Sequence, residues 1–435
     1  MRVLLAMWEG GGTIPPELTI ARKLIARGHD VRVLGDPTIE RSARTAGCDF
    51  SPWVDAPHRT NLDPSTDILR DWEFKNPFAL LRHGMKAFFC GPAGRFADDT
   101  ARVMQEYRPD VVLVDWILFG SAIAAKARGV PCATLVPNIY MRPAPGIPPF
   151  GMGLMPARGV MGRLRDTLLA RFSARLWKPG LVWINETRQR YGLPPATDLM
   201  GQADELDAVY VLTTRAFDFE ATSMPANVRY TGPQLDDPSW AAPWTSPWPA
   251  TDTRPLVLVS LSSTFQNQAS VLRSCLAALA TLPVRSLVTV GPAVNLAEFP
   301  SPGPHVAVVQ SAPHTQVLQH ARVMVTHCGH GTVMKALAAG VPIVAIPMGR
   351  DQPDTAARIV GRRAGVRLKP TASSAQIARA ITRVLEAPSY AAGARQQADA
   401  IRRETAAFDM AGDIERIAKG PRESFPREMP TAVGS

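Results

Sequence analysis

The stretch that decides the fold spans residues 2–34 and reads RVLLAMWEGGGTIPPELTIARKLIARGHDVRVL. Residues 2–8 are apolar almost throughout, which predicts a buried strand. A glycine turn at Gly10–Gly12 follows, and the two prolines after it suit the first turn of a helix. Apolar residues then recur at helical spacing until Gly28, and a second strand begins at Val31. A strand, a glycine turn, a helix and a strand form a βαβ unit, which predicts a parallel sheet.

The same alternation continues on both sides of a Pro- and Trp-rich stretch. Before it, a strand that ends in Asp115 is followed by a helix of small residues and another strand. After it, five more apolar strand patterns occur, at 256–259, 286–290, 305–309, 323–325 and 341–346. We therefore expect an α/β protein with two doubly wound Rossmann-like sheets and a ligand-binding cleft between them. The predicted units are residues 1–225, a linker over 226–254, residues 255–418 with a last helix free to pack back on the first unit, and a flexible tail over 419–435.

Composition excludes several classes of protein. The 435 residues carry a net charge of +10, but the basic residues are spread along the chain, which indicates a solvated surface better than a nucleic-acid site. The five cysteines are scattered and show no CxxC spacing, which fits a reducing compartment. The first apolar run is too short for a signal peptide, and no run approaches the roughly 20 apolar residues of a membrane span. We expect a cytoplasmic protein without a membrane span, either a monomer or a homodimer.

The segment most typical of a binding site is residues 325–337, VTHCGHGTVMKAL. A strand runs into a histidine and two glycines, and a helix is expected to start near Thr332. Backbone N–H groups at such a helix start bind phosphate oxygens. Further on, Asp351 and Gln352 supply an acid and an amide, a pair that suits sugar hydroxyls. His327, Cys328 and His330 lack the spacing of a tetrahedral metal site, so we expect no metal.

These residues resemble the donor-binding signature of the UDP-glycosyltransferase family, which includes bacterial macrolide and natural-product enzymes. The matching elements are His327-Cys328-Gly329, Gly340-Val341-Pro342 and Asp351-Gln352, and the likeness extends to residues 260–264 and 311–314. The likeness covers roughly residues 1 to 415 and is specific mainly in the second half. It implies the GT-B fold, with an acceptor-binding N-terminal domain and a nucleotide-sugar-binding C-terminal domain.

The resemblance also implies a reaction and its residues. Family members invert the anomeric centre by direct displacement, with no metal or cofactor and with a nucleotide-sugar as donor. Two alternatives stay open, namely that Thr332 is only a helix N-cap and that Asp351 and Gln352 are surface turn residues. The positions that would contact the diphosphate, base and sugar are Ser263, Ala312, His327, Gly329, Gly331, Thr332, Asp351 and Gln352.

Two departures from the family pattern bear on the donor. Many plant members carry a Trp where Ser311 stands and a Glu, which holds both ribose hydroxyls, where Lys335 stands. A deoxyribose donor has one free ribose hydroxyl fewer, so these changes favour a dTDP-sugar over a UDP-sugar. The alternative for Lys335 is that it points to solvent.

A third departure concerns the catalytic base. Thr13 stands where much of the family has a histidine that deprotonates the acceptor, and Asp115 fills the position of the acid that orients it. A threonine hydroxyl is too weakly basic for this task. Asp115 as the base itself, Glu9 on the glycine loop, and an acceptor acidic enough to need only positioning all remain open. A purely structural role for Asp115, capping the next helix, is a further alternative.

The acceptor is expected to be small and apolar, with an aromatic or polyketide-like skeleton, and its pocket is expected between about residues 50 and 160. Asp71–Glu73, His58 and His83 are possible polar contributors. A nicotinamide oxidoreductase is disfavoured because Pro15 replaces the third glycine of the GxGxxG pattern. A GT-B sugar-nucleotide epimerase and a catalytically silent sugar-nucleotide-binding homologue remain as alternatives.

Overall fold

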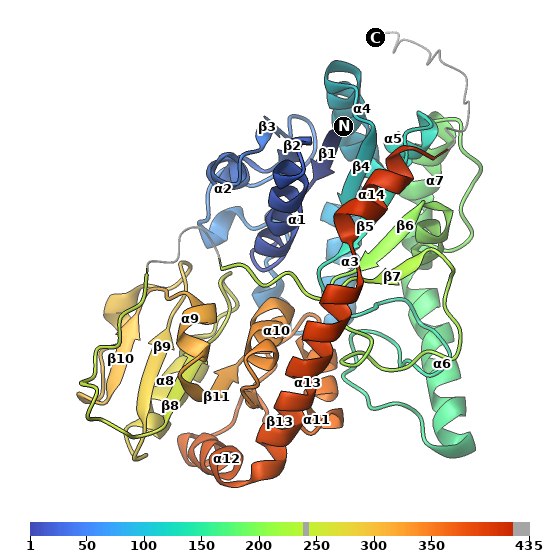
Figure 1. The fold of residues 1–435 in the computed structure, drawn as a ribbon. Helices are drawn as coiled ribbons and strands as arrows, with labels where there is room; N and C mark the ends of the chain where they lie inside the picture. The colour runs from blue at the N-terminus through green and yellow to red at the C-terminus, as the bar shows by residue number, and fades with distance from the viewer. Residues whose placement is uncertain (238–242, 421–435) are drawn as a thin grey trace.

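The computed structural model describes residues 1–237 and 243–420, which form two α/β domains (Figure 1). The first domain is built on a seven-stranded parallel sheet of order β3-β2-β1-β4-β5-β6-β7. Its strands are β1 (Arg2–Ala6), β2 (Asp30–Gly35), β3 (Asp49–Pro52), β4 (Val111–Asp115), β5 (Cys132–Val136), β6 (Ala208–Val211) and β7 (Val228–Tyr230). Its helices are α1 (Ile14–Ala26), α2 (Glu40–Thr45), α3 (Pro77–Gly84), α4 (Ala93–Tyr107), α5 (Phe119–Ala127), α6 (Gly159–Trp177) and α7 (Leu181–Arg190).

The second domain contains a six-stranded parallel sheet of order β10-β9-β8-β11-β12-β13. The strands are β8 (Leu256–Ser260), β9 (Arg285–Thr289), β10 (Val306–Val309), β11 (Ala321–Thr326), β12 (Ile343–Ala345) and β13 (Gly365–Arg367). The helices of this half of the chain are α8 (Ala269–Leu279), α9 (His314–Leu318), α10 (His330–Ala338), α11 (Gln352–Gly361), α12 (Ser374–Glu386), α13 (Pro388–Ala407) and α14 (Met410–Ala418). Both sheets are thus doubly wound, as the βαβ pattern predicted.

Side chains alternate along the strands, so each face of the first sheet packs against its own set of helices. Leu113 on β4 points into a core shared with α1 and α14, whereas Val112 and Val114 point into a core shared with α4 and α5. Successive strand residues face opposite sides of a sheet. Asp115 therefore follows Leu113 onto the α1 side.

The end of the described chain returns to the first domain. After crossing the second domain as α13, the chain forms α14, which lies against the first sheet (Figure 1). Met410, Ile414 and Ile417 of α14 are buried in the core that contains β1 and α1. The hydroxyl of Tyr210 on β6 donates a hydrogen bond to Asp413 over 2.8 Å. The last helix thus packs on the first domain and ties the two domains together.

Some element boundaries differ from the sequence prediction. Strand β7 falls inside the stretch 226–254 that was predicted as linker, because it pairs with β6 and completes the first sheet. Between β5 and β6 the chain forms α6 and α7, and an irregular loop precedes them. Of the predicted tail, residues 421–435 lie outside the described residues. No helix within the described ranges is both long and apolar enough to cross a membrane.

Candidate active site

Three loops from the two domains meet at the carboxyl edges of the sheets. A methyl group added to Gly11 would collide with Thr264 and would lie 3.2 Å from Ser263 Oγ, so the glycine loop touches the loop after β8. A methyl group on Gly331 would have Gly12 O as its nearest neighbour, at 3.9 Å. The start of α10 therefore faces the glycine loop across the domain boundary, and a methyl group at Gly331 would only reach van der Waals contact with it.

The turn into α10 explains the residue types of the motif. Cys328 adopts a positive φ of 74°, which lets the chain reverse between β11 and the helix. At Gly329 a Cβ would lie 2.7 Å from Nε2 of His327, so only glycine lets that ring lie across the turn. The helix begins at His330 and not near Thr332. Thr332 is thus in the first turn and is not an N-cap, and the first N–H groups of the helix have no intrahelical partner.

The ring of His327 is held in a neutral state. The side chain is 7% exposed, and burial lowers its pKa to about 3, with the nearby Arg350 acting in the same direction. At neutral pH it carries one N–H donor and no charge. Any contribution to binding an anion would therefore come from hydrogen bonding.

The motif residues next to His327 are used for packing inside the protein. His330 stacks on Phe217 of the first domain at 6.3 Å, and its Nε2 lies 3.4 Å from Leu212 O. Cys328 is buried in the core of the second domain. In the described part of the chain, no three His, Cys, Asp or Glu side chains gather as a metal ligand set.

Asp351 and Gln352, at the start of α11, are fixed in place by hydrogen bonds. Gln352 is buried, and its Oε1 accepts hydrogen bonds from the Met348 and Gly349 N–H groups while its Nε2 donates to Gln266. Asp351 accepts a 2.8 Å hydrogen bond from Asn138 of the first domain, and burial raises its pKa. These side chains are therefore not surface turn residues, because both are tied into the loop that closes β12.

Arg350, which the sequence analysis did not single out, links this loop to the first domain. Its Nε and Nη2 bond both carboxylate oxygens of Asp71 over 2.6 and 3.0 Å, and its Nη1 donates to Thr264. Next to this pair, Trp72 meets Phe265 edge-on at 5.0 Å. In the sequence, a sign of this contact was the basic residue Arg350 directly before Asp351. Its partner Asp71 lies in a distant loop and could not be identified from the sequence.

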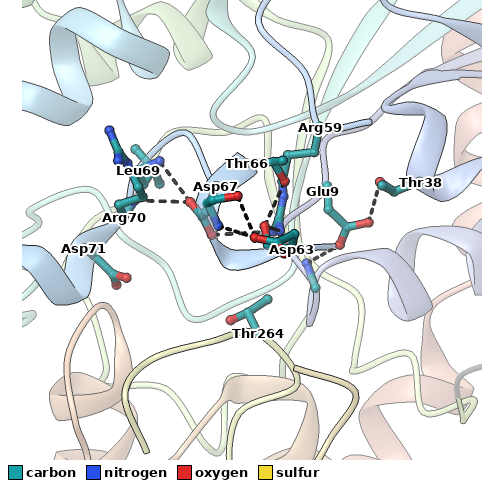
Figure 2. A network of polar contacts seen from close by, with 12 residues as sticks. Glu9, Thr38, Arg59, Asp63, Thr66, Asp67, Leu69, Arg70, Asp71 and Thr264 are labelled. Atoms are coloured by element: carbon teal, nitrogen blue, oxygen red, sulfur yellow. Dashed lines mark hydrogen bonds and ion pairs between the residues drawn. The ribbon is translucent and has the colours of Figure 1, made fainter. Parts of the chain in front are cut away.

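Asp71 extends from an ordered polar segment of the first domain. Figure 2 shows Asp67, Asp63 and Arg59 linked by hydrogen bonds, with Asp71 and Thr264 beside them. This segment brings a carboxylate from the first domain to Arg350 of the second.

Asp115 lies at the carboxyl end of β4, one strand away from the glycine loop on β1. It is 1% exposed, and its Oδ1 accepts a hydrogen bond from the Ile117 N–H, while Oδ2 has no partner. Burial raises its pKa to about 6. Helix α5 begins only at Phe119, so Asp115 does not cap it. Thr13, at the start of α1, likewise has a buried Oγ1 without a partner.

Comparisons with known proteins identify the family of the chain. Residues 275–417 match the family model of the erythromycin biosynthesis protein CIII-like C-terminal domain. The chain is 29% identical over 431 residues to 4′-demethylrebeccamycin synthase of Lentzea aerocolonigenes, covering 96% of this chain and 99% of that one. It is 30% identical over 355 residues to demethyllactenocin mycarosyltransferase of Streptomyces fradiae, covering 80% and 71%. The chain belongs to this family of natural-product glycosyltransferases.

The solved structures agree on the fold. The glycosyltransferase of kitacinnamycin superposes with a TM-score of 0.74 at 22% identity, covering 96% of this chain and 98% of that one. The predicted GT-B fold of two Rossmann-like domains is confirmed, and so is the prediction of an enzyme that transfers sugars. These relatives give no support to the epimerase or to the silent homologue.

Within this glycosyltransferase, Glu9 shapes the glycine loop. Its Oε1 accepts a hydrogen bond from the Gly11 N–H and its Oε2 accepts one from Thr38, as Figure 2 shows. Burial raises its pKa. Because both oxygens are bonded to the protein, we assign Glu9 to the shape of the loop and not to the acceptor.

Lys335 does not point to solvent. Its Nζ forms a 2.7 Å ion pair with Asp237, which also accepts hydrogen bonds from the N–H and the hydroxyl of Thr315. Lys335 is buried, and burial lowers its pKa although Asp237 opposes this. The lysine of this glycosyltransferase is therefore committed to an internal pair next to Thr315 of α9, and Ala312 is buried in the loop before that helix.

An apolar cavity lies in the first domain. Its walls come from β4, β5, α5, the loop after β5 and the segment before β6, and they include Val114, Asp115, Phe119, Tyr140, Met141 and Leu206. The sequence predicted an acceptor pocket between about residues 50 and 160. Part of the wall of this cavity, including Leu206, lies outside that range.

Proposed function

We propose that this glycosyltransferase moves a sugar from a dTDP- or UDP-sugar to a small apolar acceptor by single displacement with inversion. The observation that carries the proposal is the start of α10, whose first N–H groups have no intrahelical partner and which faces Gly12 of the first domain. In the reaction an acceptor O–H or N–H attacks the anomeric carbon, the carbon–oxygen bond to the diphosphate breaks, and the acceptor proton passes to Asp115.

The diphosphate would lie at the first turn of α10. Free N–H groups of the residues from His330 to Thr332 and the positive end of the helix dipole favour an anion there. Neutral His327 lies beside this turn, and Ser263 stands at the opposing loop. Donors fixed in place stabilise the charge that develops on the leaving group, so the proposal requires no metal ion and no cofactor.

The structure supports dTDP as the nucleotide. A carboxylate at position 335 would suit two ribose hydroxyls, but Lys335 is instead paired with Asp237. A related fold, VinC, was solved in complex with dTDP and superposes with a TM-score of 0.65 at 18% identity. The Ala312 backbone would contact the base, and Asp351 with its loop partner Gln352 would line the sugar side.

Titration of the protein with dTDP and with UDP, in buffer without metal and again with Mg²⁺, tests this proposal. We expect micromolar binding that Mg²⁺ does not strengthen, with dTDP bound more tightly than UDP. Tighter binding of UDP would contradict the nucleotide assignment, and binding that requires Mg²⁺ would contradict the metal-independent mechanism. Failure of both nucleotides to bind would contradict the donor site itself.

The ion pair between Arg350 and Asp71 is expected to hold the domains closed over the donor. Arg350→Gln and Asp71→Asn should each weaken dTDP affinity by roughly threefold to tenfold, because a partly buried charge loses its partner. The double variant should be no weaker than the worse single variant. A calorimetric double-mutant cycle measures this coupling. Additive losses would show that the two side chains act independently.

A further inference from the structure

Several buried polar atoms lack a hydrogen-bond partner at the junction of β1, α1 and β4. They are Trp8 Nε1, Thr13 Oγ1, both carboxylate oxygens of Glu17, and Asp115 Oδ2. Most buried polar groups in proteins are hydrogen-bonded, and each exception needs an explanation. The two elements that carry the acids are β4 and α1, whose side chains share one face of the first sheet.

Glu17 is the unexpected member of this group. Its side chain is 0% exposed, although it lies in the first turn of α1. It interacts directly with Asp115, and burial together with the Asp115 charge raises the pKa of Glu17 well above its usual range. Two carboxylates side by side have acceptors only, so they repel each other; one shared proton supplies the missing donor.

We infer that Glu17 is a positioning residue of the glycosyl transfer: its neutral carboxyl donates a hydrogen bond to Asp115 and holds that carboxylate ready to accept the acceptor proton. The inference rests on the proposed function. It accounts for a reaction with Thr13 in place of the family histidine, since α1 supplies a different partner for Asp115.

The proton balance is simple. The acceptor O–H or N–H bond breaks, and its proton bonds to Asp115 as the acceptor electron pair bonds to the anomeric carbon. The electrons of the sugar–phosphate bond leave with the nucleotide diphosphate. Glu17 keeps its own proton throughout, and Asp115 releases the new proton to water when the product leaves.

The charges around the pair come from few groups. Besides contacting Glu17, Asp115 accepts a hydrogen bond from the Ile117 N–H, and the nearby Trp8 indole lowers its pKa. The charged groups of α14, which also packs on α1, bond elsewhere: Asp413 to Arg229, Tyr210 and Arg416, and Glu415 to Arg27 and His29. Among the described residues, the protonation of the pair is therefore governed by burial and by the mutual contact.

The pH profile of kcat/KM in Glu17→Gln and Glu17→Leu tests the inference. The wild type should lose activity as pH falls through about 6, since Asp115 must be ionised. A neutral Glu17 lowers the pKa of Asp115 by its hydrogen bond, so the inflection should move upward in the glutamine variant and further in the leucine variant. At pH 7 we expect kcat to fall by roughly tenfold or more, with dTDP affinity unchanged.

The direction in which the inflection of the pH profile moves distinguishes a neutral Glu17 from an ionised one. If Glu17 were ionised, its removal would take away a repulsive charge and move the inflection downward, which would overturn the inference. Unchanged kcat and an unchanged profile would overturn it as well. Thr19→Val is the matched control: Thr19 is buried on the same helix, where its hydroxyl bonds Pro15 O, and the variant should keep the wild-type profile.

A readout without turnover separates this inference from the proposed function. An infrared difference spectrum between wild type and Glu17→Gln at pH 7.5 should contain the band of one protonated buried carboxyl. That band should persist in Thr19→Val. Its presence would support the shared proton even if no sugar transfer were found, and its absence would contradict the inference even if transfer were normal.

Discussion

Asp115→Asn is expected to lower kcat by about a hundredfold to ten-thousandfold, the usual contribution of a general base. The amide cannot accept a proton, yet it retains an oxygen for the Ile117 N–H that Asp115 now bonds. Donor affinity should stay within about twofold of wild type, because the proposed phosphate site lies on α10. Steady-state kinetics together with dTDP titration measure both effects.

Asp207→Asn is the matched control for this variant. Asp207 also bonds a backbone N–H, that of Cys132, but it does so at the opposite end of the first sheet. Its replacement should leave kcat unchanged. If Asp115→Asn turned over at the wild-type rate, the acceptor would have to lose its proton without this residue, and an acidic acceptor that needs only positioning would become the better explanation.

The turn that carries the proposed donor site was predictable because its geometry is local. A histidine and two glycines between a strand and a helix specify a turn that only certain residues permit, and the structure shows why at Gly329 and Cys328. The error of two residues in the start of α10 is small on this scale, since helix ends are the least certain part of such predictions.

The acceptor half depends on contacts between distant segments. Glu17 has the sequence signature of an exposed acid that stabilises a helix N-terminus. Its burial follows from the packing of α1 on the face of the sheet to which Asp115 points, and one sequence contains no sign of that pairing. The bond between Arg350 and Asp71 was equally hidden in the sequence. It forms only after a loop of the first domain has folded and brought its carboxylate to the second domain.

Gly331→Ala is expected to weaken dTDP affinity by about tenfold to a hundredfold, the range for lost hydrogen bonds to a charged group. In the free protein a methyl group fits at this position, since the nearest atom would be Gly12 O at 3.9 Å. Alanine is also a better helix former than glycine, so stability should not fall. The methyl group would occupy the space in which phosphate oxygens approach the helix amides.

Because the free protein tolerates the methyl group, loss of affinity would report on the ligand and not on the fold. Ala339→Ser, at the exposed far end of the same helix, should leave both affinity and melting temperature unchanged. Calorimetry and thermal unfolding of the two variants separate the outcomes. Wild-type affinity in Gly331→Ala would mean that the diphosphate does not contact the start of α10. The donor would then have to bind elsewhere in the cleft, although the turn at Gly329 has the geometry of an anion site.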